Sequence, residues 1–313
     1  MLMNNTVAGR LAPSPTGLLH LGNAWAFLLA WLAVRKCGGR LILRLEDIDT
    51  QRSRPIFAEQ LMRDLRWLGL DWDEGPYRQS ERIALYEEAF CKLTPHLYPC
   101  FCTRKELKEL ASAPNGVDGQ PFYPGTCREL PQEIVQARLL AGDKHSLRLC
   151  VPSENIVFTD RVYGLQSLGP CDYGGDFPIR RSDGLFSYQL CCAIDDSLMG
   201  ISQVVRGRDI LVSTARQRIL QTLLGLSLPS EYIHFPLLID QTGVRLAKRH
   251  KSLTLASLRE RCVAAETIVG YLAYLAGINP GMAPRYPHEL VSAFTYTSLP
   301  VNDIVLDCER LFL

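Results

Sequence analysis

The first part of the chain alternates short apolar runs with a longer run of helical spacing. Residues 7–12 are a short apolar segment that predicts a strand. Residues 22–36 carry apolar and small side chains at helical spacing, and the sequence CGG that ends at Gly39 is a usual end for a helix. In "RLILRLED", residues 40–47, apolar and polar positions alternate with period two. Strand, helix and strand at this spacing predict a parallel βαβ unit.

The same reading predicts the elements that follow. Helices are expected from Pro55 to residue 70, over residues 81–97 and over residues 208–224. Strands are expected over residues 145–152 and 155–164, in one mixed sheet, and over residues 201–207 and 233–239. Residues 98–130, rich in Cys, Pro and Gly, are expected to form a compact insertion. From Leu253 the pattern is mainly helical, and it fades in the last stretch of the chain.

Composition narrows the class of protein only slightly. A chain of 313 residues that is 47% hydrophobic can bury one main core with attachments, or two cores. The net charge of +1 neither requires nor excludes nucleic acid, so any basic patch has to be local. The longest apolar run, residues 24–34, is too short to cross a bilayer, and the start of the chain lacks the layout of a signal peptide. We therefore expect a cytoplasmic protein with no membrane partner.

The eleven cysteines are not expected to form a disulfide framework in such a reducing compartment. Most of them are expected to be small apolar residues of the core. Cys100, Cys102 and Cys127 in the insertion are the exception, because three thiolates can bind zinc. A fourth ligand is not obvious from spacing, since no His lies between them, and buried or free thiols remain the alternative.

The loop before the first helix has the features of an anion site. A helix N-terminus exposes unpaired N–H groups and the positive end of the helix dipole, so it attracts phosphate. In "PSPTGLLHLGN", residues 13–23, Gly17 and Gly22 let the backbone approach a ligand, and His20 adds a donor. Taken alone, a single His-x-Gly is more often an ordinary surface turn.

A longer pattern around this loop resembles a known family. Residues 10–22 are similar to the opening of the glutamyl- and glutaminyl-tRNA synthetases, and "HLGN" stands where these enzymes have the class I "HIGH" signature, with Asn23 in place of the last His. Residues 38–53, 176–196 and 204–217 extend the resemblance, which covers most of residues 7–250. It implies ATP binding at His20, Gly22 and Asn23, with His20 and the helix dipole stabilising charge on the α-phosphate.

The resemblance also implies a fold. We expect an α/β protein with the Rossmann-type parallel sheet of a class I aminoacyl-tRNA synthetase, an inserted acceptor-binding-like subdomain and a short helical C-terminal region. The first half of the catalytic domain is expected over residues 1–97, and a zinc-containing insertion with the acceptor-like subdomain over residues 98–185. The second half of the catalytic domain is expected over residues 186–240. Residues 241–313 are expected to form an ATP loop and a truncated helical region that lacks an anticodon-binding domain.

By position, the resemblance also implies a glutamate site. Its residues are Arg10, Leu11, Ala12, Pro13, Ser14, Glu46, Tyr188 and Arg206. The guanidinium groups of Arg10 and Arg206 suit carboxylates, Glu46 suits the ammonium group, and Tyr188 can donate its hydroxyl. The ordinary alternative is that Glu46 is a strand-end ion-pair partner and Arg206 a surface charge. Two arginines favour glutamate over glutamine, whose neutral amide would not compensate their charge.

A second ATP loop is expected in the polar segment 240–252. "RLAKR" is similar to the "KLSKR" form of the glutamyl enzymes, which implies ATP binding by Arg245, Leu246, Ala247, Lys248 and Arg249. Lys248 is the expected main phosphate contact, and with His20 the expected catalytic group. The competing register, "KRHKS" at residues 248–252, would use Lys251 instead, and a solvated basic loop is the ordinary alternative.

Two features resemble the short glutamyl-Q-tRNA(Asp) synthetases within this family. Their Cys-x-Cys, then Tyr, then Cys four residues later matches Cys100, Cys102, Tyr123 and Cys127, which implies one structural Zn²⁺ per chain. Only residues 253–313 follow the second ATP loop, fewer than an anticodon-binding region needs.

That resemblance implies a monomeric ligase. Its expected activity is to activate L-glutamate with ATP and Mg²⁺ without tRNA, and then to transfer the glutamate to the queuosine base of tRNA(Asp). A reduced glutamyl-tRNA synthetase that charges the terminal ribose, and a non-enzymatic relic that binds tRNA or nucleotide, are the rival interpretations.

Overall fold

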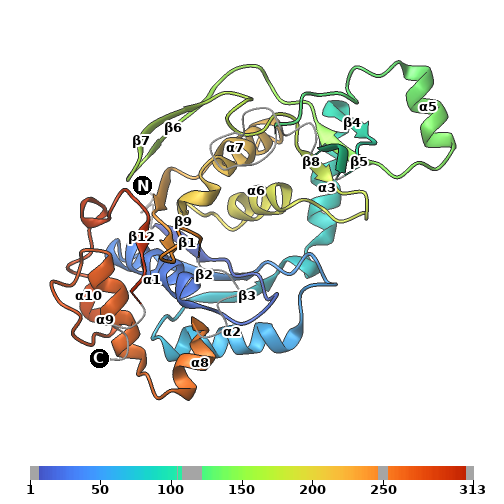
Figure 1. Ribbon diagram of the computed structural model, residues 1–313. Coiled ribbons are helices and arrows are strands. Elements are labelled where there is room, and N and C mark those ends of the chain that lie inside the picture. The colour runs from blue at the N-terminus through green and yellow to red at the C-terminus, as the bar shows by residue number, and fades with distance from the viewer. Residues whose placement is uncertain (1–6, 104, 108–121, 246–252, 308–313) are drawn as a thin grey trace, which may run out of the picture.

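The computed structural model describes residues 7–103, 105–107, 122–245 and 253–307 (Figure 1). It confirms the predicted βαβ unit: β1 (Ala8–Leu11) and β2 (Arg40–Leu45) pair in parallel and are connected by α1 (Leu21–Lys36). β3 (Glu74–Arg78) adds in parallel to the other side of β2, after α2 (Pro55–Trp67). α2 begins at Pro55 as expected, because proline suits the first turn of a helix.

Helix α1 is buried on almost every side. From Phe27 to Val34 every side chain is buried, as the nearly continuous apolar sequence requires. The helix ends as predicted: Cys37 is its C-cap, and Gly38 follows in the left-handed conformation, with φ of 61°. α1 contacts β1, β2 and β9 (Gln203–Gly207), so one helix joins the two parts of the main sheet.

A second sheet continues the first beside β1. Its order is β7 (Gly164–Leu168), β6 (Ile156–Asp160), β10 (Glu231–Phe235) and β9, with β10 parallel to both of its neighbours. The Ser202 N–H donates to the Ala8 carbonyl at 2.9 Å, which joins β9 to β1 at their amino ends. The chain pairs β1 with β2 on one side and β9 with β10 on the other. Such a switch point opens a crevice at the carboxyl ends of the strands, where ligands of open α/β sheets bind.

The insertion has a small antiparallel sheet of its own. Its order is β4 (Leu97–Cys100), β5 (Ser146–Leu149) and β8 (Pro178–Arg180), and α5 (Gln132–Leu140) extends from it with no buried residue (Figure 1). The predicted strands 145–152 and 155–164 both exist, but the expectation that they share one mixed sheet is wrong. β5 pairs with β4 and β8, whereas β6 pairs with β7 and β10.

Two predicted strands are too long, for local reasons. The strand expected over residues 155–164 stops at Asp160, whose Oδ1 accepts the N–H groups of Val162 and Tyr163 at 2.9 Å and so fixes a turn. The strand expected over residues 233–239 is split into β10 and β11 (Leu238–Ile239) around Pro236, which cannot donate to a ladder.

Three predicted helices differ from the observed ones. The expected helix over residues 81–97 is α3 (Ile83–Leu93), preceded by the 3₁₀ turn η1 (Gln79–Glu81) and followed by η2 (Thr94–His96), which contains Pro95. The helix expected over residues 208–224 begins as the 3₁₀ turn η3 (Arg208–Ile210) and continues as α7 (Ser213–Leu223). α2 ends three residues before the predicted position 70, at Trp67. Helix α6 (Tyr188–Leu198) begins within the apolar run 184–196 and packs on α7 and α3.

The C-terminal part is mainly helical, as expected. It contains α8 (Leu255–Glu260), α9 (Ala265–Leu275), α10 (Pro287–Leu290), the 3₁₀ turn η5 (Tyr296–Ser298) and β12 (Ile304–Val305). β12 pairs in parallel with β11, so the end of the described chain returns to the mouth of the main sheet. None of the helices seen in the described ranges combines the length and apolar character that crossing a membrane requires.

The cysteines correct one expectation. All ten within the described ranges are free, which agrees with the absence of a disulfide framework expected there. The prediction that most are core residues is wrong, because Cys37, Cys91, Cys150, Cys171 and Cys262 are exposed and only four of the ten are buried.

Candidate active site

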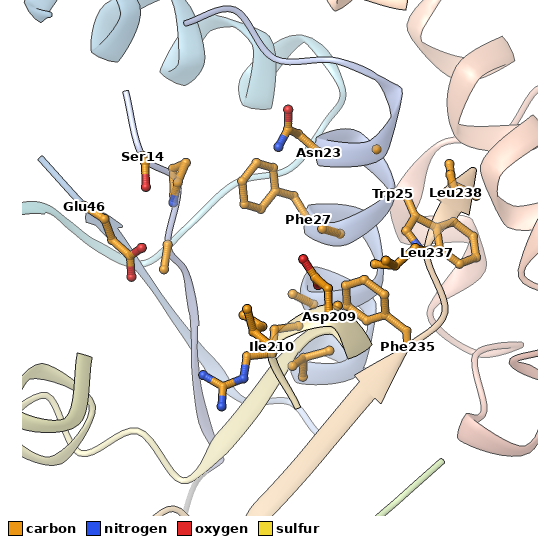
Figure 2. Close-up of a pocket in the computed structure, with 18 of the residues that line it drawn as sticks. Ser14, Asn23, Trp25, Phe27, Glu46, Asp209, Ile210, Phe235, Leu237 and Leu238 are labelled. Carbon is orange, nitrogen blue, oxygen red and sulfur yellow. The ribbon is translucent and has the colours of Figure 1, made fainter. Parts of the chain in front are cut away.

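A cavity of about 510 Å³ opens at the carboxyl ends of β1 and β9 (Figure 2). Its volume lies in the range of small-molecule sites. Its lining comes from four parts of the chain: the loop and helix after β1, the end of β2, the first residue of α6, and the segments around β9 and β10.

Most of the predicted site residues lie on this cavity. Its lining includes Arg10, Ala12, Pro13, Ser14, His20, Gly22, Asn23, Glu46, Tyr188, Arg206 and Arg245. Leu11 is not part of the lining, because its side chain is fully buried in the hydrophobic core. Leu246, Ala247, Lys248, Arg249 and Lys251 lie outside the described residues. The geometry thus brings the two expected substrate sites into one cavity.

The "HLGN" sequence forms a reciprocal cap on α1. His20 is the N-cap residue, and its Nδ1 accepts from the Gly22 N–H at 3.1 Å. The Asn23 side-chain oxygen accepts from the His20 N–H, also at 3.1 Å. Asn23 therefore has a local function at the position where its sequence departs from "HIGH". Because Nδ1 accepts, the neutral His20 ring carries its proton on Nε2.

The residues on either side of segment 246–252 both lie close to the cavity. After the segment, Thr254 forms a β-bridge with His20 and the Leu255 N–H donates to the Leu19 carbonyl at 2.9 Å, so this end meets the "HLGN" cap. Before the segment, Arg245 lines the cavity and forms an ion pair with Asp209, which follows β9.

A buried ion network holds one end of the cavity. Asp196 on α6 accepts from Arg44 at 2.6 Å and from Arg10 at 3.1 Å, and both ion pairs are almost completely buried. Arg44 also donates to Glu46 at 3.3 Å. Burial opposes the charge of Asp196, but Arg10 and Arg44 more than offset it and lower the pKa of this carboxyl.

Glu46 has the opposite balance. Burial is the largest influence and raises the pKa of its carboxyl, although the positive charge of Arg44 acts against the shift. The Cys192 thiol donates to Glu46 Oε1 at 3.2 Å and fixes the orientation of the carboxyl. A cation placed beside Glu46 would favour its ionised form, so the residue is suited to an ammonium group.

Arg206 is buried without a carboxylate partner among the residues that the structure describes. Its Nε donates to His234 at 3.1 Å, and its two terminal nitrogens donate to Gln217 and Thr214 at 2.8 Å. Only 6% of Arg206 is exposed, and all three of these partners are neutral acceptors when His234 is uncharged. An anion that binds beside this guanidinium would stabilise its buried positive charge.

The buried acids around this end of the cavity are not evenly paired with the arginines. Asp196 and Glu46 contact Arg10 and Arg44, while Asp195 and Asp209 are paired with Arg82 and Arg245. A further buried acid, Asp160, contacts His234, which separates it from Arg206. Arg206 therefore lacks a direct carboxylate contact among the described residues, and the arrangement favours a ligand carboxylate beside it.

The other end of the cavity is apolar. Trp25, Phe27, Phe235, Leu237 and Leu238 gather there, across from Ser14 and Glu46 (Figure 2). The Trp25 ring is fixed by a hydrogen bond from its Nε1 to the Pro236 carbonyl at 2.9 Å. This end can pack against a flat, uncharged group of a ligand.

A cluster of thiols lies apart from the cavity, in the insertion. The Sγ atoms of Cys100, Cys102 and Cys127 are all within 4.8 Å of one another. The Tyr123 hydroxyl lies 3.4 Å from Cys100 Sγ and accepts from the Cys127 N–H at 2.9 Å. Zinc prefers four ligands in a tetrahedron with Zn–S bonds of about 2.3 Å, and these spacings fit such a set after small side-chain adjustments.

Several residues of the network were not selected from the sequence. Arg44, Asp196, Asp160 and His234 are all buried. Arg44, Asp196 and His234 each contact a predicted site residue directly, and Asp160 contacts His234. One signal was present: Arg44 and His234 are polar residues within apolar strand segments, where a buried polar group needs a partner.

Comparisons with known proteins agree with this geometry. The family described as tRNA synthetases class I (E and Q), catalytic domain, matches residues 6–296. The glutamyl-Q tRNA(Asp) synthetases of Nitratidesulfovibrio vulgaris and Symbiobacterium thermophilum are 50% and 48% identical to the chain, and the alignments cover 97% of each partner. Glutamate–tRNA ligase 2 of Alkalilimnicola ehrlichii is 45% identical over 86% of this chain, which spans 58% of that protein.

Solved structures give the same result. The glutamate–tRNA synthetase of Elizabethkingia anophelis superimposes with a TM-score of 0.80 at 27% identity, covering 98% of this chain and 69% of the other. The glutamate–tRNA ligase of Elizabethkingia meningosepticum, solved in complex with its amino acid, has a TM-score of 0.78 at 28% identity, covering 98% and 68%. The chain is therefore a ligase of the class I tRNA synthetases (E and Q), and within them it belongs to the family of the glutamyl-Q tRNA(Asp) synthetases.

Proposed function

We propose that this enzyme activates L-glutamate with ATP in the absence of RNA and then transfers the glutamyl group to the queuosine base of tRNA(Asp). The observation that carries the first step is the buried guanidinium of Arg206, whose three described hydrogen-bond partners are neutral acceptors, at the polar end of the cavity. The names of the relatives support the second step, since several relatives that match nearly the whole chain are called glutamyl-Q tRNA(Asp) synthetases.

The contacts of Arg206 support glutamate over glutamine. Glutamate carries two carboxylates, so its second carboxylate supplies the direct anionic partner that Arg206 lacks. Glutamine has a neutral amide there and would leave Arg206 buried without an anionic partner, which costs several kcal/mol in a low-dielectric site, on the order of 3 to 5. In this proposal Arg10 and Arg206 bind the carboxylates, Glu46 the ammonium, and Tyr188 donates a hydroxyl, while Leu11, Ala12, Pro13 and Ser14 contribute backbone and the Ser14 hydroxyl.

ATP is assigned to the rest of the cavity. Its phosphates would lie at the N-terminus of α1, near His20, Gly22 and Asn23, and its base would pack on the apolar end. Arg245, Leu246, Ala247, Lys248 and Arg249 are the further contacts proposed for ATP, with Mg²⁺ accompanying the nucleotide.

The reaction then has two balanced steps. An oxygen of the glutamate α-carboxylate attacks the α-phosphorus, an O–P bond forms, and the bond to the β-phosphate oxygen breaks to release pyrophosphate. A queuosine hydroxyl next attacks the acyl carbon, an ester forms, its proton leaves, and AMP departs. His20 and Lys248 would stabilise the charge that develops on the phosphates, so the protein needs only to position the reactants and supply no nucleophile.

The thiol cluster suits a structural role in this scheme. Cys100, Cys102 and Cys127 with the Tyr123 oxygen would bind one Zn²⁺, which would hold the loops of the insertion in place. The cluster lies outside the cavity lining, so it would act on RNA positioning rather than on the reacting atoms.

The second candidate is a short glutamyl-tRNA synthetase that charges the terminal ribose. The 45% identity to glutamate–tRNA ligase 2 of A. ehrlichii favours it. Both candidates share the first step and differ only in the acceptor hydroxyl.

The test compares acceptors that differ in one base. Queuosine-containing and queuosine-free tRNA(Asp), and tRNA(Glu), are incubated with ATP, Mg²⁺ and labelled glutamate, and nuclease fragments are isolated to locate the label. We expect label only in the anticodon fragment of queuosine-containing tRNA(Asp), and its loss after periodate oxidation of the queuosine diol. Equal labelling of queuosine-free tRNA, or label at the 3′ end, would favour the second candidate.

A further inference from the structure

His234 connects a buried carboxylate to Arg206 across three adjacent strands. It lies on β10, directly opposite Arg206 on β9, and Asp160 ends the neighbouring strand β6. Its Nδ1 is 2.7 Å from Asp160 Oδ2, and its Nε2 accepts from Arg206 Nε at 3.1 Å. Both His234 and Asp160 are buried, with exposures of 0% and 1%, so solvent does not compete for these contacts.

The contacts of Asp160 leave one arrangement of protons. Its Oδ1 accepts the backbone N–H groups of Val162 and Tyr163, and its Oδ2 accepts the backbone N–H of His234 at 3.0 Å. A carboxylate used in this way accepts only, so the imidazole Nδ1 must be the donor. The Nε2 lone pair is then available for the Arg206 N–H. The pKa of His234 is lowered to about 4 by its burial, which agrees with a neutral ring that can accept this bond.

The remaining contacts of Arg206 complete its orientation. Thr214 and Gln217 each accept from one terminal nitrogen, and the Thr214 hydroxyl lies 3.4 Å from His234 Nε2. Arginine has five N–H donors in one plane, and three of them are used here. One N–H on each terminal nitrogen is left, which is the pair that a carboxylate can accept in bidentate fashion.

We propose that Asp160 and His234 act as positioning residues that orient the guanidinium of Arg206 toward a carboxylate of the substrate. The inference rests on the proposed function in assigning that carboxylate to glutamate. Asp160 fixes the Nδ1–H tautomer of His234, and His234 fixes the plane of the guanidinium. Neither residue lines the cavity, so neither touches the substrate or the reacting atoms.

Two variants of His234 separate positioning from simple packing. In His234→Gln the amide oxygen can take the place of Nε2 and still accept from Arg206. In His234→Asn the amide takes the place of Nδ1, keeps a donor for Asp160 and loses the acceptor for Arg206. Both variants leave Asp160, Thr214 and Gln217 unchanged.

The first measurement is glutamate-dependent ATP–pyrophosphate exchange. We expect His234→Asn to raise the KM for glutamate about 10-fold to 100-fold, as for a lost hydrogen bond to a charged group, with kcat and the KM for ATP nearly unchanged. His234→Gln should stay within about threefold of the wild-type KM, as a rescue by the conservative variant. Equal losses in both variants, or losses in kcat alone, would overturn the positioning role.

The second measurement does not depend on glutamate. In ¹⁵N-histidine-labelled full-length protein, the His234 signal is identified among the six histidines by its loss in His234→Gln. We expect a neutral ring protonated at Nδ1 at pH 7, and protonation at Nε2 would overturn the proposal. If the wild-type protein fails to activate glutamate, the proposed function falls, whereas this spectrum still decides which nitrogen faces Arg206.

Discussion

Replacing Arg206 with glutamine tests the charge balance of the polar end. The change Arg206→Gln removes one positive charge but keeps an amide that can still reach Thr214 or Gln217. The remaining arginines of the polar end, Arg10 and Arg44, already contact Asp196 and Glu46. The pocket would lose the guanidinium that has no carboxylate contact, and with it the reason to prefer a ligand with a second carboxylate.

The size of the effect follows from the burial of Arg206. Only 6% of this residue is exposed, so its ion pair with a substrate carboxylate would be shielded from water. Truncating one partner of a buried, hydrogen-bonded charge pair costs about 2 to 5 kcal/mol. At about 1.4 kcal/mol for each factor of ten, kcat/KM for glutamate should fall by about 30-fold to several thousandfold. The preference for glutamate over glutamine should fall in the same variant.

The assay is ATP–pyrophosphate exchange with glutamate and with glutamine, and Arg208→Gln is the matched control. Arg208 is only two positions away, but its side chain is 43% exposed and donates to Asp303 at 2.7 Å outside the cavity. An exposed ion pair of this kind contributes little free energy, so kcat/KM of Arg208→Gln should stay within about threefold of the wild-type value. If kcat/KM for glutamate falls by less than about fivefold in Arg206→Gln, or if the variant still rejects glutamine as the wild type does, the charge argument is refuted.

Four other features give expected outcomes of their own. Glu46→Gln should raise the KM for glutamate about tenfold or more while the KM for ATP stays constant; an unchanged KM for glutamate would remove the ammonium role. Cys127→Ser should lower the zinc content, measured by elemental mass spectrometry, from about one ion per chain to almost none, and zinc-free wild-type protein would contradict the assigned site. Because burial lowers the pKa of His234 from 6.5 to about 4, the unfolded chain binds this proton first as pH falls. The free energy of unfolding from urea titrations should therefore decrease by up to about 3 kcal/mol between about pH 6.5 and pH 4, and His234→Gln should flatten that decrease; equal slopes would contradict it. Gly9→Ala would place a Cβ against the Val34 side chain and should lower stability by about 1 to 3 kcal/mol in the same titration, whereas an unchanged midpoint would show that β1 and α1 have room to shift apart.

Local patterns were sufficient for the parts of the fold that are close in sequence. The βαβ unit over residues 8–45 follows from two changes of hydrophobic period, from strand to helix and back, and from the glycines that end α1. The loop at residues 13–23 could be placed at a helix N-terminus for the same reason. The predicted lengths of other elements were wrong where one residue overrides the hydrophobic pattern. Pro236 follows β10 and ends it, and the Asp160 carboxylate fixes a turn after β6.

Contacts between distant segments could not be predicted in this way. Asp160 and His234 are 74 positions apart, and Arg44 and Asp196 are 152 positions apart. Nothing in the sequence around either partner specifies the other, because the sheet order that brings them together depends on tertiary packing. The pairing of β11 with β12 is also invisible, since strands of two residues have no period to detect. Most of the described residues taken from the resemblance line the cavity, with Leu11 as an exception, but the buried network behind them was not predicted.

The most direct test of the account is glutamate-dependent ATP–pyrophosphate exchange by the purified protein with no RNA present. We expect exchange with L-glutamate, far weaker exchange with L-glutamine, and no stimulation by added tRNA. Absence of exchange with glutamate, or exchange that begins only when tRNA is added, would contradict the claim that this cavity alone joins glutamate to ATP.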